Sequence, residues 1–225
     1  MSDGLKDGNE PREQGKKAPQ SVLQRRLTAI LAADIAGFSG LMSADEQGTY
    51  ERFRSHRLEL IDPLIAEHRG RIVKLMGDGF LVEFGSVVSA VECAVRIQRG
   101  MASRNGGVPE GRQMKLRIGV NLGDVLVDGD DIFGNGVNIA ARLEAAAEPG
   151  AIYLSSEAHR QVRQAMNADF EDLGERGLKN IPEPVRIYRL RAVPEQSSVA
   201  DRSLDWMNVP RPTPPADQPS IIVLP

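Results

Sequence analysis

The chain of 225 residues carries 28 Lys and Arg against 31 Asp and Glu, has a formal net charge of -3 at pH 7, and is 41% hydrophobic. This composition is typical of a soluble globular protein of one or two domains. The lack of a basic excess argues against a nucleic-acid-binding protein. The single cysteine, Cys93, excludes an intrachain disulfide and a cysteine metal cluster, and we expect it to lie in the core.

The sequence has no segment that reads as a secretory signal, and no apolar run approaches the roughly 18 residues of a membrane span. We therefore expect a cytoplasmic protein. Residues 1–24 are polar and predict a disordered N-terminal tail. Residues 193–225 contain seven prolines and predict a linker that ends in the start of a truncated further domain, or in a short tail that docks back. One folded domain is expected over residues 25–192.

In chain order, residues 26–33 predict a buried strand that ends at Asp34. Residues 44–68 have helical spacing of apolar residues, and Pro63 is expected to kink or divide this helix. Residues 71–84 form two apolar runs around Gly-Asp-Gly, which is a strong hairpin signal. Residues 86–103 then predict an amphipathic helix with a serine at its N-cap.

Further along, residues 114–120 and 124–128 predict two strands separated by Leu-Gly-Asp, with an Asp-Gly turn at 128–129. An Ala-rich helix is expected over 134–147, a strand over 151–155, and then a short helix capped by Ser155 or Ser156. The closing strands are expected at 169–173 and 185–190. The order β-α-β-β-α-β-β-α-β-α-β-β predicts an α+β fold with mostly antiparallel hairpins.

Two carboxylates occupy unusual positions. Asp34 ends a buried strand, where a charged group is costly unless a partner such as a metal ion compensates it. The alternative is that Asp34 caps the turn that follows. Asp78 is held at the exposed apex of the predicted hairpin, because the flanking glycines supply the positive φ of a tight turn. The alternative is that Asp78 is only a turn residue.

Three further polar residues complete the candidate set. Lys74 lies on the first strand of the same hairpin. Asn138 and Arg142 are four residues apart and are expected to share one helix face. The alternative is that Arg142 only forms a salt bridge with Glu144 or Glu148. Acids that can hold divalent metal ions, together with cations that can take up phosphate charge, suit phosphoryl chemistry.

The segments AADIAGFS, GRIVKLMGDGFLVEF and DDIFGNGVNIAARLE resemble, in this order, the catalytic domain of class III nucleotide cyclases. The resemblance covers about residues 25–191. It implies a ferredoxin-like, palm-type sheet with helices packed on it. The tail PADQPSIIVLP also resembles the linker into a downstream helical-repeat region of some bacterial cyclases.

Residue by residue, the resemblance makes Asp34 and Asp78 the metal-binding aspartates and implies that Ile35 gives the metal its backbone carbonyl. Two Mg²⁺ or Mn²⁺ ions per site are implied. Lys74 and Asp131 match the pair that reads the purine, and they resemble the adenine-selective type, whereas guanylate cyclases carry Glu and Cys there. The remaining matches are Asn138 for the ribose, Arg142 for the transition-state phosphate, and Phe38 and Gly77 for other substrate contacts.

The resemblance therefore implies an adenylate cyclase that converts ATP to 3′,5′-cyclic AMP and pyrophosphate. It also implies a head-to-tail homodimer in which the metal-binding acids of one chain meet the purine, ribose and phosphate residues of the other. The alternatives are a guanylate or mixed-specificity cyclase and a nucleotide-binding regulatory module.

Two features depart from the family pattern. The stretch from Gly123 to Asp131 is shorter than the hairpin arm that helps many members to dimerise, which leaves the strength of the dimer open. Asp130 precedes Asp131, so either residue could supply the purine-binding carboxylate.

Overall fold

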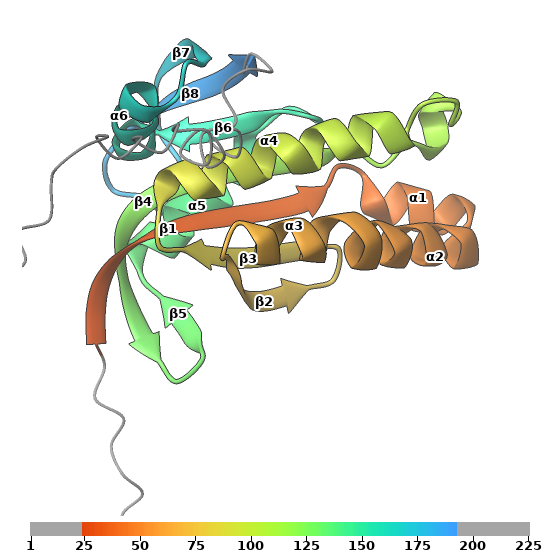
Figure 1. The fold of residues 1–225 in the computed structure, drawn as a ribbon, viewed down its shortest axis with the longest axis horizontal. Coiled ribbons are helices and arrows are strands. Elements are labelled where there is room, and N and C mark those ends of the chain that lie inside the picture. The colour runs from red at the N-terminus through yellow and green to blue at the C-terminus, as the bar shows by residue number, and fades with distance from the viewer. Residues whose placement is uncertain (1–23, 193–225) are drawn as a thin grey trace, which may run out of the picture.

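The computed structural model describes residues 24–192. The predicted linker and residues 1–23 of the predicted tail lie outside the described residues, whereas Gln24 begins the first strand. One eight-stranded sheet runs through this part in the order β2-β3-β1-β4-β6-β8-β7, with β5 paired to β4 (Figure 1). Its pairs are antiparallel except that of β4 with β6. The strands are β1 (Gln24–Ile35), β2 (Arg71–Met76), β3 (Gly79–Phe84), β4 (Leu116–Asp128), β5 (Asp131–Phe133), β6 (Ile152–Ser155), β7 (Asp169–Arg176) and β8 (Val185–Ala192).

Helices cover both faces of this sheet, with α3 and α4 on the face toward the viewer in Figure 1 and α5 behind it. Successive residues of a strand point to opposite faces. Accordingly, Ala29 and Leu31 of β1 pack in the large core cluster with α3 and α4, while Ile30 and Ala32 pack in a smaller cluster with Ala140 of α5. The helices are α1 (Phe38–Ala44), α2 (Glu46–His56), α3 (Asp62–Glu67), α4 (Val87–Arg104), α5 (Asn135–Ala146) and α6 (Ser156–Ala165).

Most of the predicted elements are confirmed in type and order, and the α+β expectation is confirmed with them. The helix expected over 44–68 consists mainly of α2, a π-helical turn at Arg57–Ile61 and α3, and Pro63 follows this turn. Ser86 caps α4 and Ser155 caps α6 through their side-chain oxygens. A short 3₁₀ helix (Glu110–Arg112) lies in the loop before β4.

One predicted boundary is wrong. The Leu-Gly-Asp segment at 122–124 does not separate two strands, because β4 is continuous from Leu116 to Asp128. Its residues pair with the whole of β1, from Gln24 opposite Val127 to Ile35 opposite Leu116. This long pairing outweighs the local turn preference of Gly-Asp. Both predicted strands, 114–120 and 124–128, therefore belong to β4. The Asp-Gly turn at 128–129 leads into β5, a short strand that was not predicted and that pairs back on β4.

Two further expectations concern the environment of Cys93 and the presence of membrane-spanning helices. Cys93 is fully buried, as predicted, and burial raises the pKa of its thiol to about 12. Within residues 24–192, no helix combines the length and the apolar character needed to cross a membrane.

Helix α5 lies close to β4 because glycine occupies the contact. A Cβ atom added to Gly119 would stand 2.4 Å from the carbonyl oxygen of Ala140 and 2.4 Å from the amide nitrogen of Glu144. Both are backbone atoms, so they cannot move aside unless the helix moves. Gly119 therefore sets the distance of α5 from the sheet, and with it the positions of the polar side chains that α5 carries.

We expect Gly119→Ala to lower the free energy of unfolding by about 1–3 kcal/mol, because the added methyl overpacks a backbone contact. Urea unfolding followed by circular dichroism measures this change. Gly85→Ala is the matched control, since a Cβ at Gly85 meets no heavy atom within 4 Å. Equal losses of stability in the two variants would contradict the close approach of α5 to β4.

Candidate active site

Strand pairing brings the two candidate metal-binding aspartates together. Antiparallel pairing of β1 with β3 places Ala33 opposite Phe80. Asp34, near the end of β1, therefore lies beside the β2–β3 turn that carries Asp78. The backbone N–H of Ile35 donates to Asp78 Oδ2 at 3.2 Å and links the two segments. Asp34, Ile35 and Asp78 are thus assembled at one end of the sheet.

The carboxylate of Asp34 bonds across the sheet and does not cap the following turn, so that alternative is wrong. Its partner is Arg117, the residue directly opposite on β4. Arg117 Nε donates to Oδ1 at 2.9 Å and Nη2 donates to Oδ2 at 2.5 Å. The same Nη2 lies 3.3 Å from Glu144 Oε1, and Nη1 donates to the carbonyl of Ala145 at 3.4 Å. Arg117 therefore joins the central strand to α5.

Glu144 is a third carboxyl group close to the two aspartates. Burial, a hydrogen bond with Asp34 and the nearby charges of Asp34 and Asp78 raise the pKa of Glu144 to about 8, despite the opposing effect of Arg117. Glu144 Oε1 is buried and lacks a hydrogen-bond partner of good geometry, although Arg117 lies at ion-pair distance. The end of β1 is therefore crowded with acidic groups that share one cation.

The candidate purine-binding residues contact each other directly. Lys74 Nζ lies 2.6 Å from Asp131 Oδ2, and the hydrogen bond from Lys74 is the main reason that the pKa of Asp131 is lowered. Asp130 instead uses its backbone carbonyl, which accepts from Arg71 Nη1 at 2.6 Å. Asp131 rather than Asp130 is thus the carboxylate that faces Lys74. The Lys74 ammonium also lies 5.2 Å from the centre of the Phe133 ring.

Asn138 and Arg142 are both on α5, but their side chains diverge. Asn138 lines a cleft together with the two aspartates. Arg142 Nε instead donates to the backbone carbonyl of Lys179 at 3.0 Å, in the loop between β7 and β8. Glu144 and Glu148 pair with other arginines, so the salt-bridge alternative for Arg142 is wrong.

The two remaining candidate residues differ in their surroundings. Phe38 begins α1, and its ring packs edge to face on Phe53 with the ring centres 5.5 Å apart. Gly77 has a φ of +64° in the turn just before Asp78. A Cβ at Gly77 would meet no heavy atom within 4 Å. The backbone beside Asp78 is therefore open to an approaching ligand, whereas Phe38 is packed against the core.

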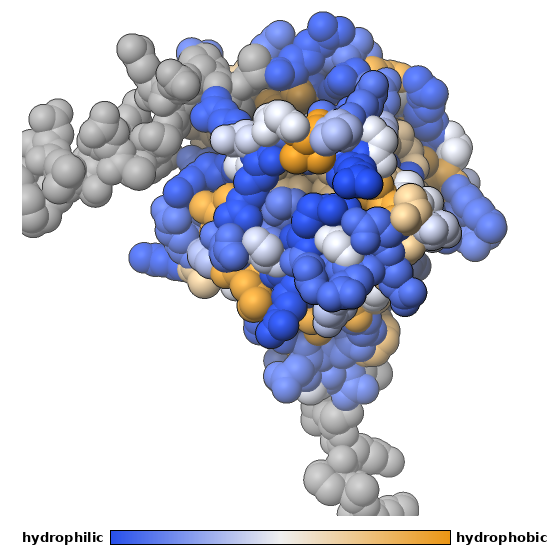
Figure 2. Space-filling view, turned by 90° about the vertical axis from the view of Figure 1, so that its right-hand side faces the viewer, coloured by the Kyte–Doolittle hydropathy of each residue, from blue (hydrophilic) through white to orange (hydrophobic). Residues whose placement is uncertain are grey.

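The cleft has a volume of about 420 Å³ and lies between α5 and the β2–β3 hairpin. Met76 and Phe133 line it and remain 52% and 46% exposed. Figure 2 views the molecule from the end toward which β1 points, where the surface is mostly hydrophilic with separate apolar spots. Neither Asp131 nor Arg142 lines the cleft; the candidate residues that do are Asp34, Lys74, Asp78 and Asn138.

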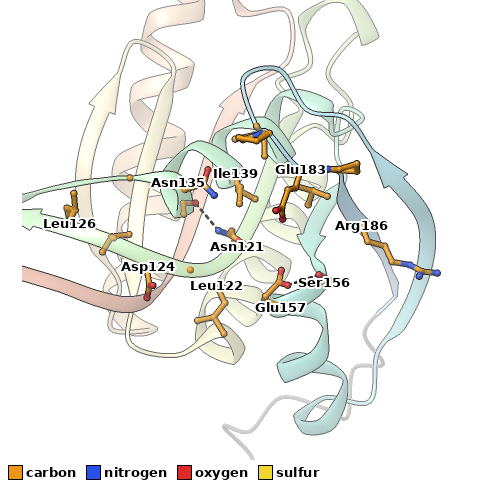
Figure 3. A pocket seen from close by; sticks show the side chains of 18 of the residues that line it. Asn121, Leu122, Asp124, Leu126, Asn135, Ile139, Ser156, Glu157, Glu183 and Arg186 are labelled. Carbon is orange, nitrogen blue, oxygen red and sulfur yellow. Dashed lines mark hydrogen bonds between the residues drawn. The ribbon is translucent and has the colours of Figure 1, made fainter.

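A larger cavity, of about 680 Å³, lies elsewhere in the described chain, between the second half of β4, the first turns of α5 and α6, and the loop before β8. Figure 3 shows Asn121 of β4 pointing toward α5, where its side-chain amide donates to the carbonyl of Gly136 at 2.9 Å. This cavity contains none of the candidate site residues. Size alone therefore does not identify the active site, and the chemistry favours the smaller cleft.

Sequence reasoning missed Arg117 and Glu144. Arg117 stands among apolar residues of a buried strand, which is the signal that could have marked it. Its partner was not deducible, because the register of β1 on β4 determines that Arg117 faces Asp34. Glu144 follows Asn138 and Ala141 on the cleft side of α5 at three-residue steps.

The α+β sheet of this chain has the fold of the class III nucleotide cyclase catalytic domain. Its paired acids lie on a central strand and on the neighbouring hairpin. Residues 24–192 match the sequence model of the adenylate and guanylate cyclase catalytic domain family, and the chain belongs to this family. Its fold is similar to that of an "Adenylate/Guanylate Cyclase/Hydrolase" from Silicibacter pomeroyi, with a TM-score of 0.72, 44% identity, and coverage of 76% of this chain and 99% of that one.

The adenylyl cyclase CyaB from P. aeruginosa has the same fold, with a TM-score of 0.70 over 79% of this chain and 100% of that one, at 24% identity. In sequence, the chain is 45% identical over 205 residues to "Putative adenylate cyclase 3" of Rhizobium meliloti (strain 1021). That match covers 90% of this chain but 34% of the relative. The chain spans about a third or less of the length of the first curated relatives that it matches.

Proposed function

We propose that this domain is an adenylate cyclase, which converts ATP to 3′,5′-cyclic AMP and pyrophosphate in the cytoplasm. The observation that carries the proposal is the direct pairing of Lys74 with Asp131 beside a cleft that also holds Asp34 and Asp78. The pair supplies a donor and an acceptor for a purine edge. The two aspartates supply hard oxygen ligands for the metal ions that accompany a triphosphate.

The purine proposal follows from hydrogen-bond complementarity. Adenine presents an amino donor at its 6-position and an acceptor at ring N1, and guanine reverses both. The Asp131 carboxylate can accept from the amino group while the Lys74 ammonium donates to N1. With guanine, the Asp131 carboxylate would face an acceptor oxygen and the Lys74 ammonium would face a donor N–H. Such mismatches in a polar site are strongly penalised. ATP is therefore the expected substrate.

The residues at the end of β1 fit a hard divalent cation. Asp34, Asp78 and the Ile35 carbonyl offer oxygen ligands only, which suits Mg²⁺ or Mn²⁺. Among the described residues, no group of three or more His, Cys, Asp or Glu is arranged as a complete metal site, so phosphate oxygens and water would complete the coordination. When bound, two such ions would supply the positive charge that activates the 3′-hydroxyl and neutralises the triphosphate.

The other residues are proposed to hold and orient the substrate. Asn138 is proposed to bind the ribose, and Arg142 is proposed to stabilise the charge that develops on the attacked phosphate. Gly77, with its open backbone, is proposed to let the substrate approach the acid end of the cleft. Phe38 is proposed to contact the substrate at the start of α1, where its present packing on Phe53 fixes its position.

The active site is proposed to form between two copies of the domain. One cleft does not gather all the candidate residues, since Arg142 and Asp131 do not line it. The β4–β5 hairpin projects from the body of the sheet (Figure 1). Exposed Leu75, Met76 and Phe133 lie on this hairpin and on β2, and apolar side chains exposed near a cleft are typical of an interface. A homodimer would then contain two equivalent sites.

Product analysis tests the proposed reaction. The purified chain is incubated with Mn²⁺ and either ATP or GTP, and the products are separated by chromatography. We expect cyclic AMP from ATP and little product from GTP. Cyclic GMP as the main product would show instead a guanylate cyclase. Binding of nucleotide with no product from either would favour a regulatory module.

A further inference from the structure

Arg117 holds Asp34 by both carboxylate oxygens. The two bonds, 2.9 Å from Nε and 2.5 Å from Nη2, form the two-point contact in which a guanidinium matches a carboxylate best. Arg117 and Asp34 are directly opposite in the antiparallel pair of β4 and β1. Their backbone positions are fixed by this pairing, so the two side chains meet without any other adjustment of the chain.

This contact competes with a metal ion for Asp34. A divalent cation needs a lone pair of the same carboxylate at a distance of about 2.1 Å. It would then carry its two positive charges close to the guanidinium of Arg117, and like charges at such a distance in a partly buried site repel strongly. A cation on Asp34 and the contact with Arg117 would therefore weaken each other.

The structure also offers Arg117 a second position. Glu144 Oε1 lies 3.3 Å from Nη2 and lacks a hydrogen bond of good geometry, and the carbonyl of Ala145 already accepts from Nη1 at 3.4 Å. Both acceptors are on α5. A small rotation of the guanidinium away from β1 would therefore keep it paired, because a carboxyl group stands ready on the helix.

We propose, building on the function proposed above, that Arg117 is a latch that occupies Asp34 in the metal-free domain and passes to Glu144 when Asp34 takes up a divalent cation. Arg117 and Glu144 are positioning residues in this account, since they act on the metal site through Asp34. The latch keeps the cluster of acids from repelling itself before the cation arrives. It also links occupation of the metal site to α5, the helix that carries Asn138 and Arg142.

Binding of Mn²⁺ to the full chain without nucleotide, followed by the electron paramagnetic resonance signal of free Mn²⁺, tests the latch. Arg117→Gln should bind Mn²⁺ on the order of tenfold more tightly than the unsubstituted chain, because the competing charge is gone. Asp34→Asn in the Arg117→Gln background should abolish the gain. Glu144→Gln should weaken binding several-fold, and should have no such effect once Arg117 is replaced.

Thermal unfolding provides the second measurement. Arg117→Gln should unfold at a lower temperature in EDTA, because the neighbouring acids lose their shared cation, and Mn²⁺ should raise its midpoint more than that of the unsubstituted chain. Arg57→Gln is the matched control, since Arg57 makes a similar two-point contact with Asp62 at 3.0 and 2.9 Å. It should lose stability without any change in Mn²⁺ affinity.

The proposal is overturned if Arg117→Gln and Arg117→Lys both bind Mn²⁺ no more tightly than the unsubstituted chain. It is also overturned if the gain in Mn²⁺ affinity remains after Asp34→Asn is added. Arg117→Lys keeps the charge but loses the two-point contact, so it should bind Mn²⁺ with intermediate affinity.

These readouts do not depend on turnover. Formation of cyclic AMP from ATP with unchanged Mn²⁺ affinity in the variants would refute the latch alone, whereas a confirmed latch in a chain that makes no cyclic nucleotide would refute the proposed function alone.

Discussion

Asp34→Ala and Arg142→Ala are each expected to lose activity alone and to recover about a quarter of the original rate when mixed in equal amounts. Random exchange between two-fold symmetric dimers makes about half of them mixed. In a mixed dimer, one site receives both substitutions and the other receives neither. One intact site in half of the dimers gives the expected quarter.

The single variants should be inactive for different reasons. Asp34→Ala removes a carboxylate from the acid end of the cleft, where the metal ions are proposed to bind. Arg142→Ala removes charge stabilisation from the transition state, a loss of about 10²–10³-fold in rate for one such group. In the described chain Arg142 turns away from the cleft toward Lys179, which suits a residue that completes the site of a second copy.

A mixture of Asp34→Ala with Asp78→Ala is the matched control for this experiment. Both residues belong to the same side of the proposed shared site, so every site in a mixed dimer lacks one of them. No recovery is expected. Cyclic AMP formation in this control, or its absence from the Asp34→Ala and Arg142→Ala mixture, would contradict a site shared between two chains.

The second large effect is expected at the purine pocket. Lys74→Glu combined with Asp131→Cys should reverse the preference between ATP and GTP by at least about 10²-fold, since polar sites discriminate strongly when their hydrogen bonds are mismatched. Lys74→Glu alone should lose activity with both nucleotides. It replaces the ammonium of a 2.6 Å ion pair with a second carboxylate facing Asp131.

The ratio of kcat/KM for ATP and for GTP measures this change. Asp130→Asn is the matched control, because Asp130 is bonded through its backbone carbonyl to Arg71. It should leave the ratio unaltered. A ratio that changes with Asp130→Asn, or that stays fixed in the double variant, would show that Lys74 and Asp131 do not read the base.

Local signals were sufficient for much of the fold. The Gly77-Asp78-Gly79 hairpin, the capped helix after Ser86 and the helix that carries Asn138 follow from turn chemistry, capping and periodicity. These patterns depend on neighbouring residues, so they can be recognised without knowing the partner of each strand. The continuous β4 strand could not be recognised in this way, because Gly123 is kept extended by its pairing opposite Thr28 of β1.

The candidate site shows the same limit. Asp34 and Asp78 were proposed from their positions at a strand end and a turn tip, and Lys74 from its place on the same hairpin, while the family resemblance supplied their roles. Arg117 was missed because its importance arises from a register that places it opposite Asp34. The direction of Arg142 was also not predictable, since it depends on a carbonyl in a loop far along the chain.

The central claim is that two copies of this domain cyclise ATP at a shared site. The most direct test is the specific rate of cyclic AMP formation from ATP, with excess Mn²⁺, over a wide range of protein concentration. We expect the specific rate to be low in dilute solution and to rise to a plateau as dimers form. A specific rate that is the same at every concentration while the chain remains monomeric, or a complete absence of cyclic AMP, would contradict this account.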